Sequence, residues 1–304
     1  AGQSVTTGLQ NVYIGSLCGD TVDDSSYNVG VGHSALSAQN GDSNTAVGRS
    51  AGEACSGSEN VYIGKGAAQS VTSATNNVVI GFNAVNQQAL TGTQNTVVGN
   101  KAGYVMSGAC NNNTIIGDSA GYAVSTGDNH LLLGHDAGRT GSPGGNFTTH
   151  DNRITLGDEN IIESNVQVDW TIASDQRDKT DFTDLDIGLD FVKALEPVTY
   201  KWDKRSKYID KTDPNVDLNS VTHDGTHKED WLDIGFKAQA VEALEEAAGY
   251  SSDDKTNLTV SLSGDGKQYG LQYSKFVPIL VKAVQELSAT VETLQAEIEL
   301  LKGE

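Results

Sequence analysis

The sequence predicts a mainly β chain, in which a β-roll or β-solenoid shaft precedes a small α+β domain that ends in a coiled coil. The first observation is composition, because 34 glycines but only 4 prolines accompany many Val, Ile and Thr residues. That mixture favours short strands joined by tight turns rather than a flexible linker. The second observation is a repeated unit in the first half. The third is a heptad pattern of apolar residues at the C-terminal end.

The repeated unit reads Asn-x-apolar-apolar-Gly-x-x-Ala-Gly, and its eighth copy starts with His130 in place of Asn. One unit buries almost no surface, so neighbouring units have to stack. The successive spacings of its central glycine are 17, 16, 16, 17, 18, 18 and 17 residues. These central glycines are Gly15, Gly32, Gly48, Gly64, Gly81, Gly99, Gly117 and Gly134. We expect each of them to mark a turn or a close approach to the next unit.

Small residues recur at one place in the repeat, three positions after the central glycine. This place is expected to be the tightest part of the interior, either inside one roll or on a three-fold axis between chains. The residues are Ala35, Ala51, Ala67, Ala84, Ala102, Ala120 and Ala137.

Nothing in the sequence predicts a metal or another cofactor. The cysteines Cys18, Cys55 and Cys110 are odd in number and form no CxxC pair, so we expect buried or half-buried thiols. The histidines in and after the repeats, His33, His135 and His150, lack the spacing of metal ligands. They are interpreted as surface or turn residues.

The predicted domains are a shaft at 1–138, a loop with closing strands at 139–173, and a C-terminal domain at 174–304. Within the linking region, Asn152–Gly157 resembles a last degenerate repeat and Val166–Ile172 alternates like a closing strand. The start of the chain at Ala1-Gly2 is expected to lie inside a longer protein.

The C-terminal domain changes period from strand-like to helix-like. A helix is expected to end before Pro197 and a second one to end at Gly249, and Gly264-Asp265-Gly266 indicates a hairpin turn. The predicted elements are a helix carrying Leu189, Val192 and Leu195, an extended segment Val198–Trp202, a helix carrying Ala238, Val241 and Leu244, and strands Leu258–Leu262 and Gln268–Tyr273.

A coiled coil is predicted at 277–302, with Glu297 and Lys302 placed for a pair between chains. β-branched residues at a with Leu at d favour two helices in isolated peptides, whereas the repeats upstream favour three. We expect three. The core positions are Leu280, Val284, Leu287, Val291, Leu294, Ile298 and Leu301.

One short stretch carries residues suited to nucleophilic chemistry, Ser174-Asp175-Gln176-Arg177-Asp178-Lys179. A lysine can serve as the base for a serine only when burial or a nearby cation disfavours its charged form, and Arg177 could supply the cation. From these residues alone, a solvated charged turn is the favoured interpretation.

The repeats over residues 9–138 resemble the left-handed β-roll of trimeric autotransporter adhesin heads and similar repeats of phage tail fibres. Residues 170–304 resemble the intramolecular chaperone auto-processing domain of endosialidase tailspikes and phage fibres. Four segments carry that second resemblance in order: Ser174–Lys179, Leu195–Trp202, Ile234–Val241 and Tyr273–Leu280.

The resemblance implies a domain that trimerises the shaft and then cuts its own chain between Ala173 and Ser174. Ser174 would be the nucleophile and Lys179 the base, with Asp175 and Arg177 as neighbours in the signature. A backbone donor near Gly235 would stabilise the oxyanion. Many members have His where this chain has Asp233. If that His assists cleavage, either processing here is expected to be slow, or His223 or His227 is expected to substitute for it.

The expected protein is a segment of a viral tail fibre on the virion, a homotrimer whose chaperone domain is released in the host cytoplasm. Its expected outside partner is a receptor or glycan on the host cell. A net charge of −20 argues against nucleic acid, and no apolar run is long enough for membrane insertion. The alternative is an uncut trimeric adhesin with a permanent C-terminal cap. A glycan-degrading spike ranks last, because the repeats lack recurrent acidic pairs.

Overall fold

A computed structural model describes residues 1–211, 213 and 216–303. Contacts divide the chain into two compact units. The first unit holds residues 1–161 together with two short later segments, 204–224 and 263–267. The second unit holds residues 162–203, 225–262 and 268–304.

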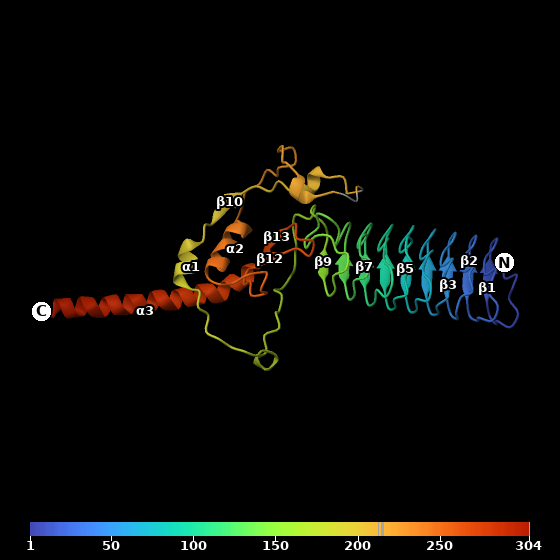
Figure 1. Ribbon diagram of the computed structural model, residues 1–304, viewed down its shortest axis with the longest axis horizontal. Helices are drawn as coiled ribbons and strands as arrows, with labels where there is room; N and C mark the ends of the chain where they lie inside the picture. The colour runs from blue at the N-terminus through green and yellow to red at the C-terminus, as the bar shows by residue number, and fades with distance from the viewer. Residues whose placement is uncertain (212, 214–215, 304) are drawn as a thin grey trace. The chain divides into compact units, whose positions relative to one another are not determined.

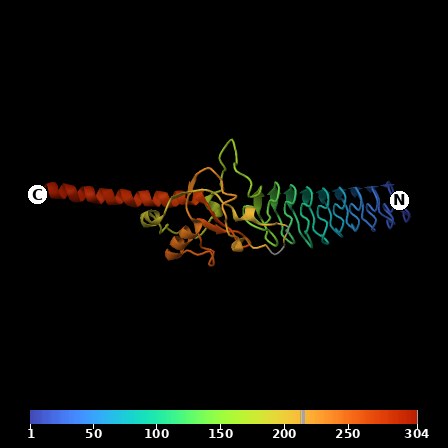
Figure 2. The same ribbon diagram turned by 90° about the horizontal axis from the view of Figure 1, so that it is seen from above.

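The first unit is built on one nine-stranded parallel sheet with a single strand in each coil, so a β-solenoid is confirmed. The strands stack in sequence order, as Figures 1 and 2 show from two directions. They are β1 (Val12–Ile14), β2 (Val29–Val31), β3 (Thr45–Val47), β4 (Val61–Ile63), β5 (Val78–Ile80), β6 (Thr96–Val98), β7 (Thr114–Ile116), β8 (Leu131–Leu133) and β9 (Ile154–Leu156). The predicted last degenerate repeat is therefore confirmed as β9.

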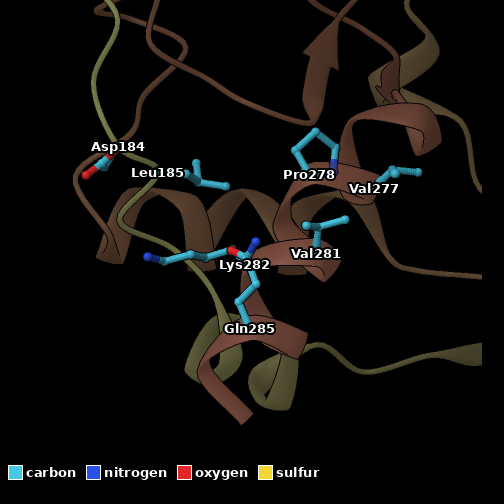
Figure 3. A pocket seen from close by; sticks show the side chains of 7 residues that line it. All are labelled: Asp184, Leu185, Val277, Pro278, Val281, Lys282 and Gln285. Atoms are coloured by element: carbon cyan, nitrogen blue, oxygen red, sulfur yellow. The ribbon is translucent and has the colours of Figure 1, made fainter. Parts of the chain in front are cut away.

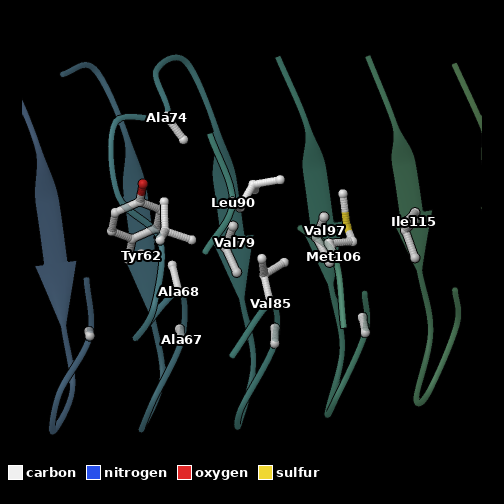
Figure 4. Close-up of a cluster of buried hydrophobic side chains, with 14 of the residues drawn as sticks. Tyr62, Ala67, Ala68, Ala74, Val79, Val85, Leu90, Val97, Met106 and Ile115 are labelled. Carbon is white, nitrogen blue, oxygen red and sulfur yellow. The ribbon is translucent and has the colours of Figure 1, made fainter. Parts of the chain in front are cut away.

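The middle residue of nearly every strand points into the coil, where it packs on the equivalent residue of the next coil (Figure 4). From β3 to β8 these residues are fully buried: Ala46, Tyr62, Val79, Val97, Ile115 and Leu132. The recurring alanines three positions after each glycine are fully buried as well. This burial occurs within one chain, so the small residues are needed inside the coil and require no three-fold axis.

The central glycines are explained by both conformation and space. Gly81 has a φ of 142°, and a Cβ built on it would lie 2.1 Å from the carbonyl oxygen of Gly99 in the next coil. Gly15 repeats the arrangement, with a φ of 127° and a distance of 2.5 Å to the oxygen of Gly32. Any side chain at these places would collide with backbone, which confirms the predicted close approach.

The asparagine that opens each repeat forms a buried ladder along the solenoid. The side-chain Oδ1 of Asn44 accepts hydrogen bonds from the backbone N–H and the Nδ2 of Asn60, at 3.1 and 3.0 Å. Asn60 Nδ2 also donates to the carbonyl of Ala74 at 2.9 Å, in the next coil. Each buried amide thus satisfies groups in two coils, and this explains why Asn recurs where a buried polar residue would otherwise be costly.

The outer face of the sheet is apolar and lacks a covering layer among the described residues. In each strand the first and third side chains flank the buried middle one, and they are half-buried or exposed. Exposed aliphatic residues on this face include Val12, Ile14, Val47, Ile63, Ile116, Ile154 and Leu156.

The second unit is a small α/β region followed by a long helix. Its core joins Ile187, Phe191, Val241, Val260, Phe276 and Ile279. The helices are α1 (Leu189–Ala194), α2 (Ala238–Ala247) and α3 (Phe276–Lys302), with short 3-10 turns η1 (Gln176–Asp178) and η4 (Tyr273–Lys275). The strands form two antiparallel pairs, β10 (Val198–Tyr200) with β11 (Asp233–Gly235) and β12 (Val260–Leu262) with β13 (Tyr269–Leu271). These elements confirm the predicted helices and the hairpin.

The predicted closing strand at Val166–Ile172 is wrong. The segment has no strand, and the side chains of Val166, Val168, Trp170 and Ile172 are exposed. An alternating sequence becomes a strand only when a neighbouring strand accepts its backbone hydrogen bonds. No described strand pairs with this segment, so within one chain it stays irregular despite its alternating sequence.

The heptad positions lie on α3, a helix of 27 residues, and all seven core side chains are exposed. None of the described helices is long and apolar enough to cross a membrane. Near the start of α3, Leu185 faces Pro278 and Val281 across an open hollow of about 510 Å³ (Figure 3). The lining of the hollow holds no serine, cysteine or histidine, so it lacks a side-chain nucleophile of these kinds.

Candidate active site at Ser174 and Lys179

Ser174 and Lys179 are brought together by a tight turn in the second unit. The Nζ of Lys179 donates a hydrogen bond to the Oγ of Ser174 at 2.5 Å. The 3-10 turn η1 lies between them and folds the chain back, so that side chains five positions apart can meet. Both side chains are exposed. The arrangement places a potential base within hydrogen-bonding distance of a potential nucleophile, but both groups stay accessible to water.

Asp175 organises this turn. Its carboxylate caps η1 by accepting a hydrogen bond from the backbone N–H of Arg177 at 2.9 Å. The same carboxylate pairs with the guanidinium of Arg177, with 2.6 Å between Nη2 and Oδ2. This contact lowers the pKa of Asp175 and raises that of Arg177. The charge of Arg177 is therefore balanced by Asp175, which weakens its effect on Lys179.

Asp233 lies on β11, where it pairs with Tyr200 of β10. Its Oδ2 accepts hydrogen bonds from Tyr200 Oη and Trp202 Nε1, each at 3.3 Å. Burial, followed by the negative charge of Asp233, raises the pKa of Tyr200 to about 12. Asp233 therefore acts as an acceptor for two neutral donors, a role for which a protonated histidine would be unsuited.

Gly235 ends β11 and pairs with Val198 of β10. Next to it, the backbone N–H of Phe236 donates to the hydroxyl of Tyr273 at 3.3 Å. Among the described residues, no hydrogen bond or ion pair joins Asp233 or Gly235 to Ser174 or Lys179. The oxyanion role of Gly235 therefore stays a prediction, as does the role of Asp233. His223 belongs to the first unit, where its ring stacks on Tyr208 with centroids 5.7 Å apart.

The cysteines are all free and buried in the solenoid, as predicted. Burial raises the pKa of each thiol, to about 11 for Cys110. A raised pKa disfavours the reactive thiolate, so these residues are structural rather than nucleophilic.

A charged cluster in the first unit was not predicted from the sequence. The Nζ of Lys211 lies between the carboxylates of Asp136 and Glu159, at 2.9 and 2.8 Å. His135 joins the same region, with its Nδ1 3.0 Å from Asp158 Oδ2. His135, Asp136 and Asp158 have the spacing of a metal group, but the ammonium of Lys211 and the guanidinium of Arg139 already pair with Asp136. The cluster draws on three separate stretches of the sequence, 135–139, 158–159 and Lys211, so no local motif could have revealed it.

The fold and this turn together define a class of protein, a β-solenoid shaft followed by a small α/β region that carries a serine–lysine pair. Residues 174–250 match the family model described as chaperone of endosialidase, a family of self-cleaving peptidases. The match begins at the predicted nucleophile Ser174. No curated protein and no solved structure gives a significant match to the chain. The chain is thus similar to this family over residues 174–250, and a β-solenoid precedes the matched region.

Proposed function

We propose that the C-terminal domain assembles three chains, aligns their solenoid shafts, and then cuts the Ala173–Ser174 bond. The observation that carries the cleavage is the 2.5 Å contact between Lys179 Nζ and Ser174 Oγ, directly after that bond. The family match starting at Ser174 supports the same residue.

The chemistry follows from the position of the nucleophile. Lys179, in its neutral form, takes the proton of the Ser174 hydroxyl, and Oγ attacks the carbonyl carbon of Ala173. The C–N bond then breaks, and the proton passes to the leaving amine of Ser174. This acyl transfer leaves an ester between the two residues. One water molecule hydrolyses the ester, giving a carboxylate on Ala173 and a free amino group on Ser174.

Assembly would supply what the isolated chain lacks. A neutral lysine is favoured by burial, yet Ser174 and Lys179 are exposed here. Covering this turn with a neighbouring chain would exclude water and favour the neutral amine. Cleavage would then follow assembly, rather than precede it.

Unpartnered apolar surfaces support a trimer. The heptad side chains of α3 are exposed, and so are aliphatic residues along the outer face of the solenoid sheet. The alternating segment Val166–Ile172 exposes a third set of large apolar side chains. Large apolar faces of this kind mark association sites. In a long fibre, a C-terminal trimer would also prevent the repeats from pairing out of register.

The proposed location is the tail fibre of a virion, with a receptor or glycan on the host cell as the outside partner and the released domain left in the host cytoplasm. The second candidate function, an uncut adhesin with a permanent cap, is favoured by the exposure of the serine–lysine pair. The two differ in whether the Ala173–Ser174 bond persists.

The test is the mass and the size of the purified chain. We expect two fragments on a denaturing gel, the smaller one starting with Ser174, and a native mass near three chains by light scattering. Ser174→Ala should give a single chain near 32.0 kDa that is still trimeric. An intact wild-type chain would favour the uncut adhesin, and a monomer or dimer would contradict the assembly proposal.

A further inference from the structure

Two segments that follow Ser174 in the sequence pack in the same unit as the solenoid. We name residues 204–224 and 263–267 the cap segments. The first contains the short 3-10 turns η2 (Arg205–Tyr208) and η3 (Leu218–Ser220). Ser206 and Leu218 in this segment are buried. The proposed cut therefore falls between the shaft and segments that are packed with it.

Lys211 makes the main contact of the first cap segment. Its ammonium contacts two carboxylates. Asp136 follows strand β8 in the same coil, and Glu159 follows strand β9. The side chains are largely enclosed, with 15% of Lys211, 5% of Asp136 and 7% of Glu159 exposed. The two carboxylates belong to the last two coils, so one lysine ties both coils to the cap.

Arg139 holds this contact in place from the shaft side. Its Nη1 pairs with Asp136 Oδ1 at 2.9 Å, and its Nη2 donates to the backbone carbonyl of Lys211 at 2.8 Å. Its guanidinium also lies 4.6 Å from the ring centre of Tyr122. From the cap side, Lys204 Nζ donates to the backbone carbonyl of Glu159 at 2.8 Å. The shaft therefore recognises both the charge and the backbone of the cap segment.

The second cap segment makes an independent contact. Asp265 Oδ2 accepts a hydrogen bond from the backbone N–H of Asn146 at 2.9 Å. The carbonyl oxygen of Gly264 lies 3.1 Å from Nε2 of His150. Asn146 and His150 belong to the loop between β8 and β9, so both cap segments bind the same end of the solenoid.

Burial makes the charged contact persistent. Although burial alone lowers the pKa of Lys211, its two carboxylate partners outweigh it and raise the pKa. Burial likewise opposes ionisation of Asp136, but Lys211 and Arg139 lower its pKa. An enclosed ion pair is screened little by salt, and loss of one partner leaves an uncompensated buried charge.

We propose that the cap segments keep the C-terminal fragment bound to the last coils of the shaft after the Ala173–Ser174 bond is cut, with Lys211 as the principal anchor. This inference rests on the proposed cleavage. The contacts of Lys204, Lys211, Gly264 and Asp265 each join a residue before Ala173 to a residue after Ser174. Cutting the bond therefore removes the covalent link and leaves these contacts intact. Cleavage and release are then two separate events, and release depends on breaking a buried ion pair.

The test separates the two events. A Ser174→Ala chain receives the recognition sequence of a site-specific protease in the exposed segment 162–173, so that it can be cut after folding without self-cleavage. The cut sample passes through size-exclusion chromatography, and fragments in each fraction are identified on a denaturing gel. We expect both fragments to co-elute. Lys211→Met should speed their separation by roughly 100-fold, because one buried carboxylate pair loses its cation.

Lys207→Met is the matched control, since it removes the same charge from the same segment at a lysine with no ion pair among the described residues. It should retain the fragment like the parent chain. If Lys211→Met fails to fold, Asp265→Asn replaces it in the test. This change weakens the independent contact with Asn146 and should also speed separation. Fragments that separate at once in the parent chain, or that stay together equally in folded Lys211→Met, would overturn the proposal. Failure of self-cleavage would appear separately, as an uncut wild-type chain.

Discussion

The Nζ of Lys179 lies 2.5 Å from the Oγ of Ser174, whereas the neighbouring cation of Arg177 pairs with Asp175 at 2.6 Å. Two cations in one turn therefore have different partners. Arg177 stabilises the turn through a carboxylate, and Lys179 is left to contact the hydroxyl. A substitution of Lys179 can therefore test its role as a base while the contacts between Asp175 and Arg177 keep the turn folded.

Lys179→Ala and Lys179→Arg should both abolish cleavage while assembly continues. Arginine keeps the charge and can donate to Ser174, but its guanidinium stays protonated and cannot accept the hydroxyl proton. Fragment bands on a denaturing gel measure the effect. Lys193→Ala, which removes a lysine paired with Asp190 on α1, is the control and should leave cleavage unchanged. Wild-type fragments from Lys179→Arg would show that Lys179 is not the base.

Leu287→Asp together with Leu294→Asp should block assembly and cleavage, and the shaft should be recovered as aggregate. The two changes place charges on the proposed seam, at a cost of about 3 kcal/mol or more per chain. Light scattering and gel analysis of the soluble fraction measure the outcome.

Ala289→Asp with Ala296→Asp is the matched control, because both residues are exposed on α3 two positions after the altered leucines. This control should assemble. A trimeric, cleaved Leu287→Asp/Leu294→Asp chain would remove the heptad seam from the assembly mechanism.

Asn95→Ala should destabilise the shaft by roughly 2 to 5 kcal/mol, because several buried polar groups would lose a partner. Asn95 Nδ2 donates to Asn77 Oδ1 and to the Cys110 carbonyl, and Asn95 Oδ1 accepts from Asn113. The denaturant midpoint of the shaft provides the measurement. Asn100→Ala, at an exposed residue that contacts Asp118, should change stability by no more than about 0.5 kcal/mol. Equal effects at the two sites would contradict the ladder.

His130 should make the shaft less stable as the pH falls from about 7.5 to about 5.5. Burial lowers the pKa of His130, although the carbonyls of His150 and Arg153 and the charge of Asp151 oppose that effect. As the pH falls through about 6.5, His130 is protonated in the unfolded chain before it is protonated in the folded chain. Acid therefore favours unfolding. His130→Asn should reduce this loss of Tm.

His135 works in the opposite direction and provides the comparison. Its hydrogen bond with Asp158 raises its pKa, so its contribution to stability is present at low pH and is lost as pH rises through the folded value. His135→Asn should therefore increase the acid sensitivity of the Tm. If His130→Asn leaves the pH dependence unchanged, the buried ring is not its source.

The sequence by itself determined the solenoid, its period, and the helices and the hairpin of the C-terminal region. Its information was local. It consisted of a glycine such as Gly81 at a close backbone approach, an asparagine such as Asn60 at the start of the first seven repeats, and helix and hairpin boundaries set by residues within a few positions. The serine–lysine pair was also local, since five residues and one turn bring Ser174 to Lys179.

Only the tertiary structure decided what depends on residues far apart in the chain. Alternation at Val166–Ile172 predicted a strand, but pairing needs a second strand, and none of the described ones is available. Lys211 resembles any surface lysine in the sequence, yet it is enclosed by Asp136 and Glu159, 75 and 52 residues away. Whether a charge is solvated or buried is set by which distant segments pack around it, and neither composition nor periodicity encodes that contact.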